Sequence, residues 1–430
     1  MARLFAAFNG PRFWVLFANL VTRGVGFATS FIIARISGAQ ALGEYSALVN
    51  TAATVIAPFL QVVGNNSTVL AVHACREGGV TVGRVAVANL LLAAVLAVAS
   101  FPVFLILQNL ALGGAKADES HLWLGLTAAG SVVVGQLCGA VLLGCCYGTG
   151  QFAGSSRVSI GVSLTVVVLV LPVVLLWGLA GAYATLAFAS VAPPLALAYS
   201  MFRGEQRSGR MVFGNQDALR NAITQFRASL PSVAATAVSA AVYWLCTIYF
   251  VQRSFGIEGV GLVAVAAQWL TVMLLAATSW GGVSLKILTE AVASGDPSAV
   301  QKATFGLLEK NLAVTLAASF IVVLGAGWIG KSYGLGDSSL DLLLRLNAGC
   351  AVVGACNIIF ERLLWAINRQ SAWFAFSAAG FLVQVAITAF FIEAGLFVVV
   401  AGSLVGSMVL LLCCFLGLNR FLCGVLKAPA

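Results

Sequence analysis

The sequence predicts an all-α polytopic membrane protein with about twelve transmembrane helices. Of its 430 residues, 61% are hydrophobic and only 9% are charged, and the mean hydropathy is +1.02. A spanning helix needs roughly 20 predominantly apolar residues. A chain of this length therefore holds about a dozen such helices with short connections, and no stretch remains for a soluble domain of useful size.

Twelve apolar runs, separated by polar or turn-forming breaks, are the predicted spans. They are 13–36, 45–72, 84–107, 122–146, 158–178, 180–202, 229–251, 261–285, 303–328, 342–366, 372–392 and 396–418. The first run is long enough to span a membrane and follows a short, weakly basic segment, so we expect it to act as its own targeting signal. Two pairs of small residues in the fourth span are typical of close helix packing: Gly135 with Gly139, and Gly144 with Gly148.

The distribution of basic residues predicts the orientation. With the N-terminus inside the cell, 17 of the 23 Lys and Arg residues fall in cytoplasmic segments, so both termini are expected to be cytoplasmic. The same bias accounts for the net charge of +9 without a nucleic-acid partner. The ten cysteines form no CxxC pair and the two histidines lie far apart, so we expect reduced packing cysteines, no metal site and no cofactor.

An internal repeat divides the chain. Three landmarks before the second span recur before the eighth span at the same offset of 218 residues: Arg35, Gly38 and Gly43 against Arg253, Gly256 and Gly261. Six spans separate the copies, so both have the same orientation in the membrane. We therefore expect an N-terminal six-helix lobe at 1–202, a cytoplasmic linker at 203–228 and a C-terminal six-helix lobe at 229–430.

The linker carries apolar residues at helical spacing: Ala218, Leu219, Ala222, Ile223 and Phe226. This pattern predicts a helix that lies in the membrane interface. A plain solvated connector is the alternative.

Polar residues inside the spans indicate where a ligand binds. Arg23 lies near the middle of the first span, where a cation costs roughly 2.5–3.5 kcal/mol, so it should face a hydrated interior and not lipid. Two lobes around a central cavity would satisfy the polar groups of several spans together. The candidate cavity residues are Arg23, Asn19, Asn65, Gln268, Arg345, Asn347 and Glu361. Because Arg can bind phosphate oxygens bidentately, the expected ligand is an anion.

Several of these residues have alternative roles. Arg23 could form a structural ion pair with Glu361, and Arg345 could extend to the lipid headgroups at the outer side. Glu361 could also carry a coupling proton. Glu361 and Arg362 are adjacent in the chain and project differently from a helix, so we expect an ion pair between them to be poor.

The sequence argues against an enzyme. It contains no GxSxG, P-loop or HExxH motif and no pair of carboxylates within one span. A membrane glycan polymerase or glycosyltransferase that acts at the outer face would be expected to carry a sizeable periplasmic loop, and every predicted outer loop is short.

The segment Phe31–Leu48, FIIARISGAQALGEYSAL, resembles the opening of bacterial polysaccharide and O-antigen flippases of the Wzx type. This family belongs to the multidrug/oligosaccharidyl-lipid/polysaccharide exporter (MOP) superfamily. Shorter matches follow in span order: Gly295-Asp296, Tyr333-Gly334 and Ala366-Ile-Asn-Arg369. The resemblance implies a V-shaped, two-lobed transporter of the bacterial inner membrane. Its substrate would be an undecaprenyl-pyrophosphate-linked oligosaccharide moved from the cytoplasmic to the periplasmic leaflet, with Arg23 as the cavity cation.

The partners implied are this polyprenyl-pyrophosphate oligosaccharide, membrane lipid and other membrane proteins of polysaccharide assembly. Two alternatives stay open. A cation-coupled multidrug exporter of the same fold would need membrane carboxylates such as Glu361. A membrane glycan polymerase or glycosyltransferase would form product without moving a lipid between leaflets.

Overall fold

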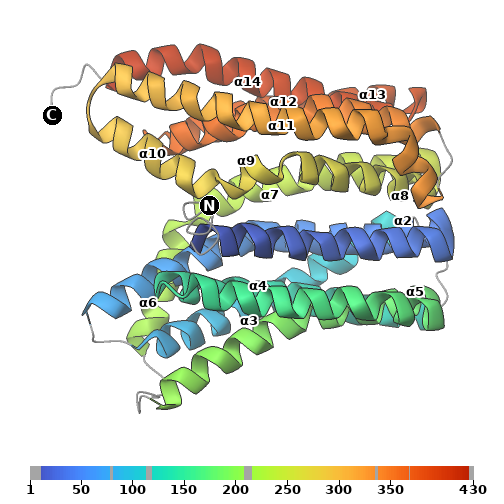
Figure 1. Ribbon diagram of the computed structural model, residues 1–430, viewed down its shortest axis with the longest axis horizontal. Coiled ribbons are helices and arrows are strands. Elements are labelled where there is room, and N and C mark those ends of the chain that lie inside the picture. The colour runs from blue at the N-terminus through green and yellow to red at the C-terminus, as the bar shows by residue number, and fades with distance from the viewer. Residues whose placement is uncertain are drawn as a thin grey trace, which may run out of the picture. The chain divides into compact units, whose positions relative to one another are not determined.

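The computed structural model describes residues 11–77, 81–112, 119–207, 216–334, 338–367 and 369–425. These residues are almost entirely helical, and they contain no β-strand. The chain divides into two compact units, Met1–Trp244 and Leu245–Ala430. Figure 1 follows the helices in chain order by colour.

The helices of the first unit are α2 (Pro11–Glu77), α3 (Val82–Leu112), α4 (Glu119–Gly148), α5 (Phe152–Arg207), α6 (Gln216–Ala228) and α7 (Leu230–Trp244). The second unit begins with a π-helical turn, Leu245–Tyr249. It continues with α8 (Phe250–Met273), α9 (Leu275–Ser279), α10 (Gly281–Ala293), α11 (Pro297–Tyr333), α12 (Ser338–Ala366), α13 (Gln370–Phe391), a 3₁₀ turn (Ile392–Ala394) and α14 (Phe397–Val425).

Nine helical stretches of the described chain are long and apolar enough to cross a membrane. Three of them contain 59, 52 and 42 residues. At 1.5 Å per residue even the shortest of the three would measure about 63 Å, about twice the hydrocarbon thickness of a bilayer. Each is broken by a glycine with positive φ: Gly38, Gly178 and Gly256. Each therefore provides two spans, and the all-α fold with twelve spans is confirmed.

The two glycines of the predicted repeat have nearly the same backbone conformation. Gly38 has φ 83° and ψ −178°, and Gly256 has φ 70° and ψ −173°. This region is essentially restricted to glycine, because other residues have a Cβ that clashes with the backbone. An added Cβ would meet nothing else within 4 Å at either position, so the conformation and not close packing requires glycine. The shared conformation supports the internal repeat.

Small residues bring the helices of the first unit together. Helix α4 lies beside α2 and α5 (Figure 1). A Cβ at Gly144 would overlap the carbonyl oxygen of Gly64 in α2, and one at Gly135 would overlap that of Ser190 in α5. The predicted packing role is thus confirmed for Gly144 and Gly135. A Cβ at Gly139, in contrast, would meet nothing within 4 Å, so the prediction is wrong at that position.

One predicted span is interrupted. Residues 261–285 were expected to form a single helix, but the structure bends this segment at Leu274 and Trp280 and divides it among α8, α9 and α10. The glycine pair that follows Trp280 weakens the helix there, since each glycine costs about 1 kcal/mol relative to alanine. The hydropathy of this run therefore did not predict that the helix is interrupted.

A helix forms in the predicted linker, and it belongs to the first unit. Helix α6 packs on α3 and α2, and α7 packs on α2, where Trp244 Nε1 donates to Thr51 Oγ1 over 2.9 Å. The two compact units divide between Trp244 and Leu245. The part of the linker at 208–215 lies outside the described residues.

Leucine-rich packing forms the core of the second unit. Leu288 of α10, Val300 of α11, Leu363 and Leu364 of α12 and Cys414 of α14 belong to one buried cluster. The opposite side of α11 is apolar and exposed, with Leu324 and Trp328 among the most exposed side chains. A helix with one apolar exposed side and one packed side is expected at the lipid boundary.

Candidate functional site

Arg23 belongs to a polar face of the first span. Thr22 and Arg23 follow Asn19 on α2 by three and four residues, so both lie on the same side of the helix as Asn19. Asn19 and Thr22 are exposed, and Arg23 is half-buried. An arginine stays charged in proteins and offers five N–H donors. The face therefore combines a permanent cation with an amide and a hydroxyl, which are groups that can bind an anion.

Open space adjoins this face. Gly24 and Gly26 stand next to Arg23 in the chain, and a Cβ added at either would meet nothing within 4 Å. Neither glycine is therefore required by a close contact with another helix. Both leave space beside the helix next to Arg23.

Helix α5 completes the polar face. The hydroxyls of Thr22 and Ser163 form a hydrogen bond of 3.2 Å. Near the start of both helices, the guanidinium of Arg157 stacks over the ring of Trp14 at 4.9 Å. The two contacts follow the same order along each helix, so the first span and the fifth run in parallel.

A row of serines on α5 was missed by the sequence analysis. Ser156, Ser159 and Ser163 are spaced by three and four residues and share one face of the helix. The hydroxyl of Ser156 is buried and has no hydrogen-bond partner among the described residues. The spacing of the three serines is visible in the sequence and was the signal that could have identified them.

The two asparagines of the second span have different surroundings. Asn65, the predicted site residue, is exposed on α2. Asn66 is buried, and its Oδ1 accepts a hydrogen bond of 3.5 Å from the Ser229 hydroxyl just before α7. Asn66 thus connects elements of the first unit, whereas Asn65 remains accessible to a ligand.

Arg345 has a partner that the sequence analysis did not name. Its Nε lies 2.9 Å from Asp341 Oδ2 and its Nη2 lies 3.4 Å from Asp341 Oδ1, one turn earlier in α12. Both side chains are substantially exposed, at 56% and 32%. An exposed pair at this spacing contributes about 0.3–0.5 kcal/mol. Arg345 therefore has a weak ion-pair partner within its own helix.

The other predicted residues of the second unit lie on α8 and α12. Gln268 is half-buried on α8, and Asn347 is buried on α12. Glu361 Oε1 lies 3.9 Å from Arg362 Nη1, so the two neighbours form only a long ion pair, in agreement with the poor bridge expected between them. Their side chains are long enough to turn toward each other although their Cα–Cβ bonds diverge. The pairing of Glu361 with Arg23 stays a prediction.

A second polar group, also missed by the sequence analysis, lies inside the second unit. Asn311, Thr315 and Ser319 of α11 are four residues apart, and each is at most 5% exposed. Asn311 Nδ2 and both hydroxyls have no hydrogen-bond partner among the described residues. Thr304 on the same helix differs, because its hydroxyl donates to the Val300 carbonyl over 2.7 Å. We call Asn311, Thr315 and Ser319 the α11 polar row.

The middle of α11, which carries the polar row, lies against the middle of α12. The residues around Val300 pack on the last turns of α12, and only a short loop joins the far end of α11 to the start of α12. The helices are therefore antiparallel, and the middle of one lies against the middle of the other. Asn357 lies in this part of α12; its Nδ2 donates to the Ser407 carbonyl over 3.1 Å, while its buried Oδ1 has no partner in the described chain.

The described residues hold no group of three or more His, Cys, Asp or Glu side chains that could bind a metal ion.

No protein-family model matches the sequence. No curated protein matches it either. Among solved structures, the chain is similar to an inward-facing MATE-family multidrug resistance transporter of the MOP superfamily, with a TM-score of 0.78 and 16% identity over 96% of this chain and 100% of that one. An outward-facing MATE transporter gives 0.67 at 16% identity, covering 98% of each chain. A MOP superfamily transporter from Pyrococcus furiosus gives a TM-score of 0.67 at 17% identity, also over 98% of each chain.

These similarities extend over nearly the whole chain and show its fold. The fold is that of MATE-family transporters of the MOP superfamily. Together with the membrane-crossing helices, it establishes a multi-pass membrane protein.

Proposed function

We propose that the chain is a flippase that moves a polyprenyl-pyrophosphate-linked oligosaccharide from the cytoplasmic to the periplasmic leaflet of the bacterial inner membrane. The observation that carries this proposal is the polar face of the first span. Arg23 lies there with Asn19 and Thr22 beside it and with open space at Gly24 and Gly26. A cation at this depth is costly unless it has an anionic or hydrated partner.

The fold supports transport, and the sign of the charge supports an anionic substrate. Among the similar structures, the Pyrococcus furiosus transporter is described as having a binding pocket of reverse polarity that suggests a different function. Change of pocket polarity is therefore compatible with this fold. In the present chain, the first span contains arginines and no carboxylate.

A pyrophosphate headgroup suits this site chemically. Its oxygens can accept paired N–H bonds from a guanidinium, and the amide and hydroxyls can bind sugar hydroxyls. The polyprenyl tail would stay in the lipid while the headgroup crosses by alternating access of the two lobes. Moving two negative charges toward a positive outside releases roughly 4–5 kcal/mol at 100 mV, so the membrane potential alone can favour export.

A second candidate is a cation-coupled multidrug exporter. Two observations favour it: the similarity to MATE multidrug transporters and the presence of Glu361, whose side chain is only 23% exposed within a membrane span. This function requires Glu361, because a cationic drug or a coupling proton needs a carboxylate. It does not require Arg23.

Transport in proteoliposomes distinguishes the two. The protein would be reconstituted with a fluorescent polyprenyl-pyrophosphate oligosaccharide, and its change of leaflet would be measured for wild type, Arg23→Ala, Arg23→Lys and Glu361→Gln. Arg35→Ala is the matched control, since Arg35 is an exposed arginine of the same helix. We expect loss in Arg23→Ala, partial retention in Arg23→Lys and normal rates in the control. Extrusion of a cationic dye by wild type, abolished by Glu361→Gln, with no glycan lipid moved, would establish the exporter instead.

The proposed orientation is tested independently of transport. Fusions of alkaline phosphatase and of green fluorescent protein to the C-terminus report opposite sides of the inner membrane. We expect a fluorescent and phosphatase-inactive C-terminus, because the positive-inside rule predicts that it is cytoplasmic. Active phosphatase at this end would reverse the orientation.

A further inference from the structure

Helix α6 is a short helix with one buried side. Its 13 residues contact α3 and α2 through Ala218 and Ala222, which are 5% and 0% exposed. These alanines pack with Ala88 of α3 and Leu70 of α2. Small side chains let α6 lie close to its neighbours, and this contact determines which of its sides face outward.

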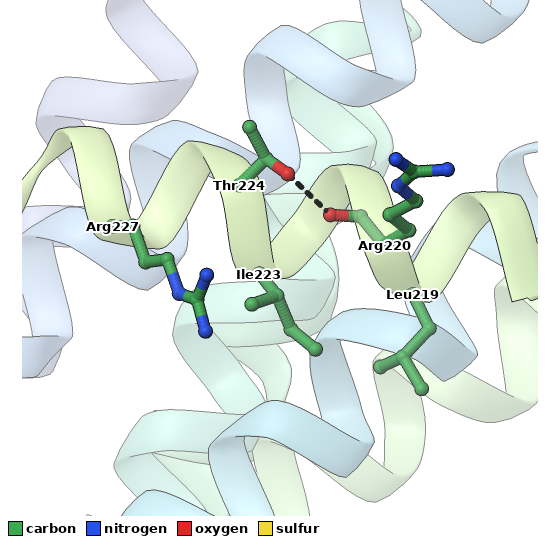
Figure 2. Close-up of a pocket in the computed structure, with 5 residues that line it drawn as sticks. All are labelled: Leu219, Arg220, Ile223, Thr224 and Arg227. Carbon is green, nitrogen blue, oxygen red and sulfur yellow. Dashed lines mark hydrogen bonds between the residues drawn. The ribbon is translucent and has the colours of Figure 1, made fainter.

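The outward side of α6 carries an apolar row and a basic row. Leu219 and Ile223 are one turn apart and remain 36% and 37% exposed. Arg220 and Arg227, seven residues apart, lie on nearly the same face, and Thr224 lies between them. Figure 2 shows Leu219 and Ile223 extending toward the same side of the helix, and the Thr224 hydroxyl bonded to the Arg220 carbonyl at 2.8 Å.

These five residues line an open hollow of about 420 Å³ on the surface of the first unit (Figure 2). Within the described residues, neither guanidinium forms an ion pair. The two charges are therefore available to an external anion. At 1.5 Å per residue they are attached about 10 Å apart along the helix, which leaves room for one phosphate group at each.

We propose that this face of α6 binds the phosphate groups of acidic phospholipids in the cytoplasmic leaflet. Charge complementarity favours an anion, and the adjoining apolar row favours an anion attached to acyl chains. An interfacial helix of this kind inserts its apolar row into the headgroup boundary while its arginines bind phosphates. This inference does not depend on which substrate the protein transports.

The position of α6 in the chain supports this assignment. It follows α5 and precedes α7, and membrane-spanning stretches lie on both sides of it, at Phe152–Arg203 and Ser232–Met273. Only a few residues separate α6 from α7. The helix is consequently held near the membrane surface, on the side that the positive-inside rule predicts to be cytoplasmic.

Lipid binding to the purified full-length protein tests the proposal. Native mass spectrometry in detergent would compare phosphatidylglycerol with phosphatidylcholine for wild type and for R220Q/R227Q. The matched control is K302Q/K310Q, which removes two exposed cations at the predicted cytoplasmic end of α11. Each arginine near an acidic headgroup changes affinity about fivefold, so we expect R220Q/R227Q to lose phosphatidylglycerol affinity by roughly 20- to 30-fold. The control should keep most of it.

Two further arms identify the ligand. Inorganic phosphate is added as a competitor, and L219S/I223S removes the apolar row while keeping both arginines. We expect weak competition by phosphate and reduced phosphatidylglycerol binding in L219S/I223S. Strong competition with no effect of L219S/I223S would assign the site to a free anion. Equal binding of both lipids by wild type, or equal losses in R220Q/R227Q and its control, would overturn the site. Size-exclusion profiles and melting temperatures in phosphatidylcholine exclude misfolding as the cause.

Discussion

The two copies of the internal repeat share their backbone breaks but differ in their polar residues. At the offset of 218 residues, Gly38 corresponds to Gly256 and both have the same rare conformation. The polar residues of the first span have only alanine counterparts: Asn19, Thr22 and Arg23 correspond to Ala237, Ala240 and Ala241. The repeated fold thus requires the glycine but not the polar face, which indicates that the polar face serves a function in the first copy alone.

The α11 polar row shows the reverse asymmetry. At the same offset, Asn311, Thr315 and Ser319 correspond to Ala93, Ala97 and Phe101 of α3. Ala93 and Ala97 are 0% and 4% exposed, so the corresponding face is buried in both copies. Each copy therefore has a polar feature where the other is apolar. The two units thus share a fold but differ in where their polar residues lie. Substitutions can compare the polar face of the first span, and the α11 polar row, with the corresponding apolar positions of the other unit.

The largest expected effect is at Arg23. Replacing it by alanine should reduce glycan-lipid transport by roughly 10- to 100-fold, because hydrogen bonds to a charged group contribute about 1.5–3 kcal/mol. Ala241→Ser, at the corresponding position of the second copy, should leave the rate unchanged. Initial rates in proteoliposomes provide the measurement. Equal sensitivity of both positions would show that the asymmetry has no role in transport.

The shared glycines should be equally sensitive in both copies. Gly38→Ala and Gly256→Ala place a Cβ in a region that is essentially restricted to glycine, at a cost of about 1–3 kcal/mol each. We expect similar falls in melting temperature for the two variants. Gly24→Ala is the control, since its added Cβ also meets nothing within 4 Å and it lies in a continuous helix. A large effect at one glycine only would argue against equivalent breaks.

The α11 polar row should respond weakly to removal of a hydroxyl. Thr315→Val keeps the shape of a side chain whose hydroxyl has no partner among the described residues, so the stability should stay within about 1 kcal/mol or rise. Thr304→Val, which removes a bonded hydroxyl, is the comparison. A loss of several kcal/mol on Thr315→Val would mean that the row binds a ligand. Melting temperature, measured with and without transport substrate, decides between these results.

The smallest expected effect is at Asp296, outside the spans at the start of α11. The Ser298 hydroxyl and backbone N–H donate to its carboxylate and lower the pKa of Asp296 below its ordinary value of about 4. A carboxyl group whose pKa is lower in the folded state than in the unfolded state stabilises the fold at pH values above its unfolded-state pKa. This stabilisation is lost as the pH falls through the folded-state pKa. The difference in melting temperature between wild type and Asp296→Asn should therefore decrease as the pH is lowered from 6 to 3. A constant difference would contradict a role for the charge.

Hydropathy and turn residues were sufficient to predict the repeat and the spans other than 261–285, which is interrupted. Both features depend on the transfer energy and backbone freedom of single residues. Contacts between distant helices were not predictable in this way. The bond between Thr22 of α2 and Ser163 of α5 was not anticipated. The Arg345–Asp341 pair lies within one helix, and its spacing of four residues was visible in the sequence but was overlooked. A polar residue in an apolar run shows that a partner is needed but does not identify it, since the partner depends on packing.

The bond between Thr22 and Ser163 also imposes an order on biogenesis. The two residues are 141 positions apart. At a synthesis rate of about 5–20 residues per second, roughly 7–28 s separate their appearance at the ribosome. During this interval the nascent first span, with Arg23 in it, is in the membrane before its neighbour on α5 exists. Completion of the fifth span therefore sets the earliest time at which the proposed anion site can assemble.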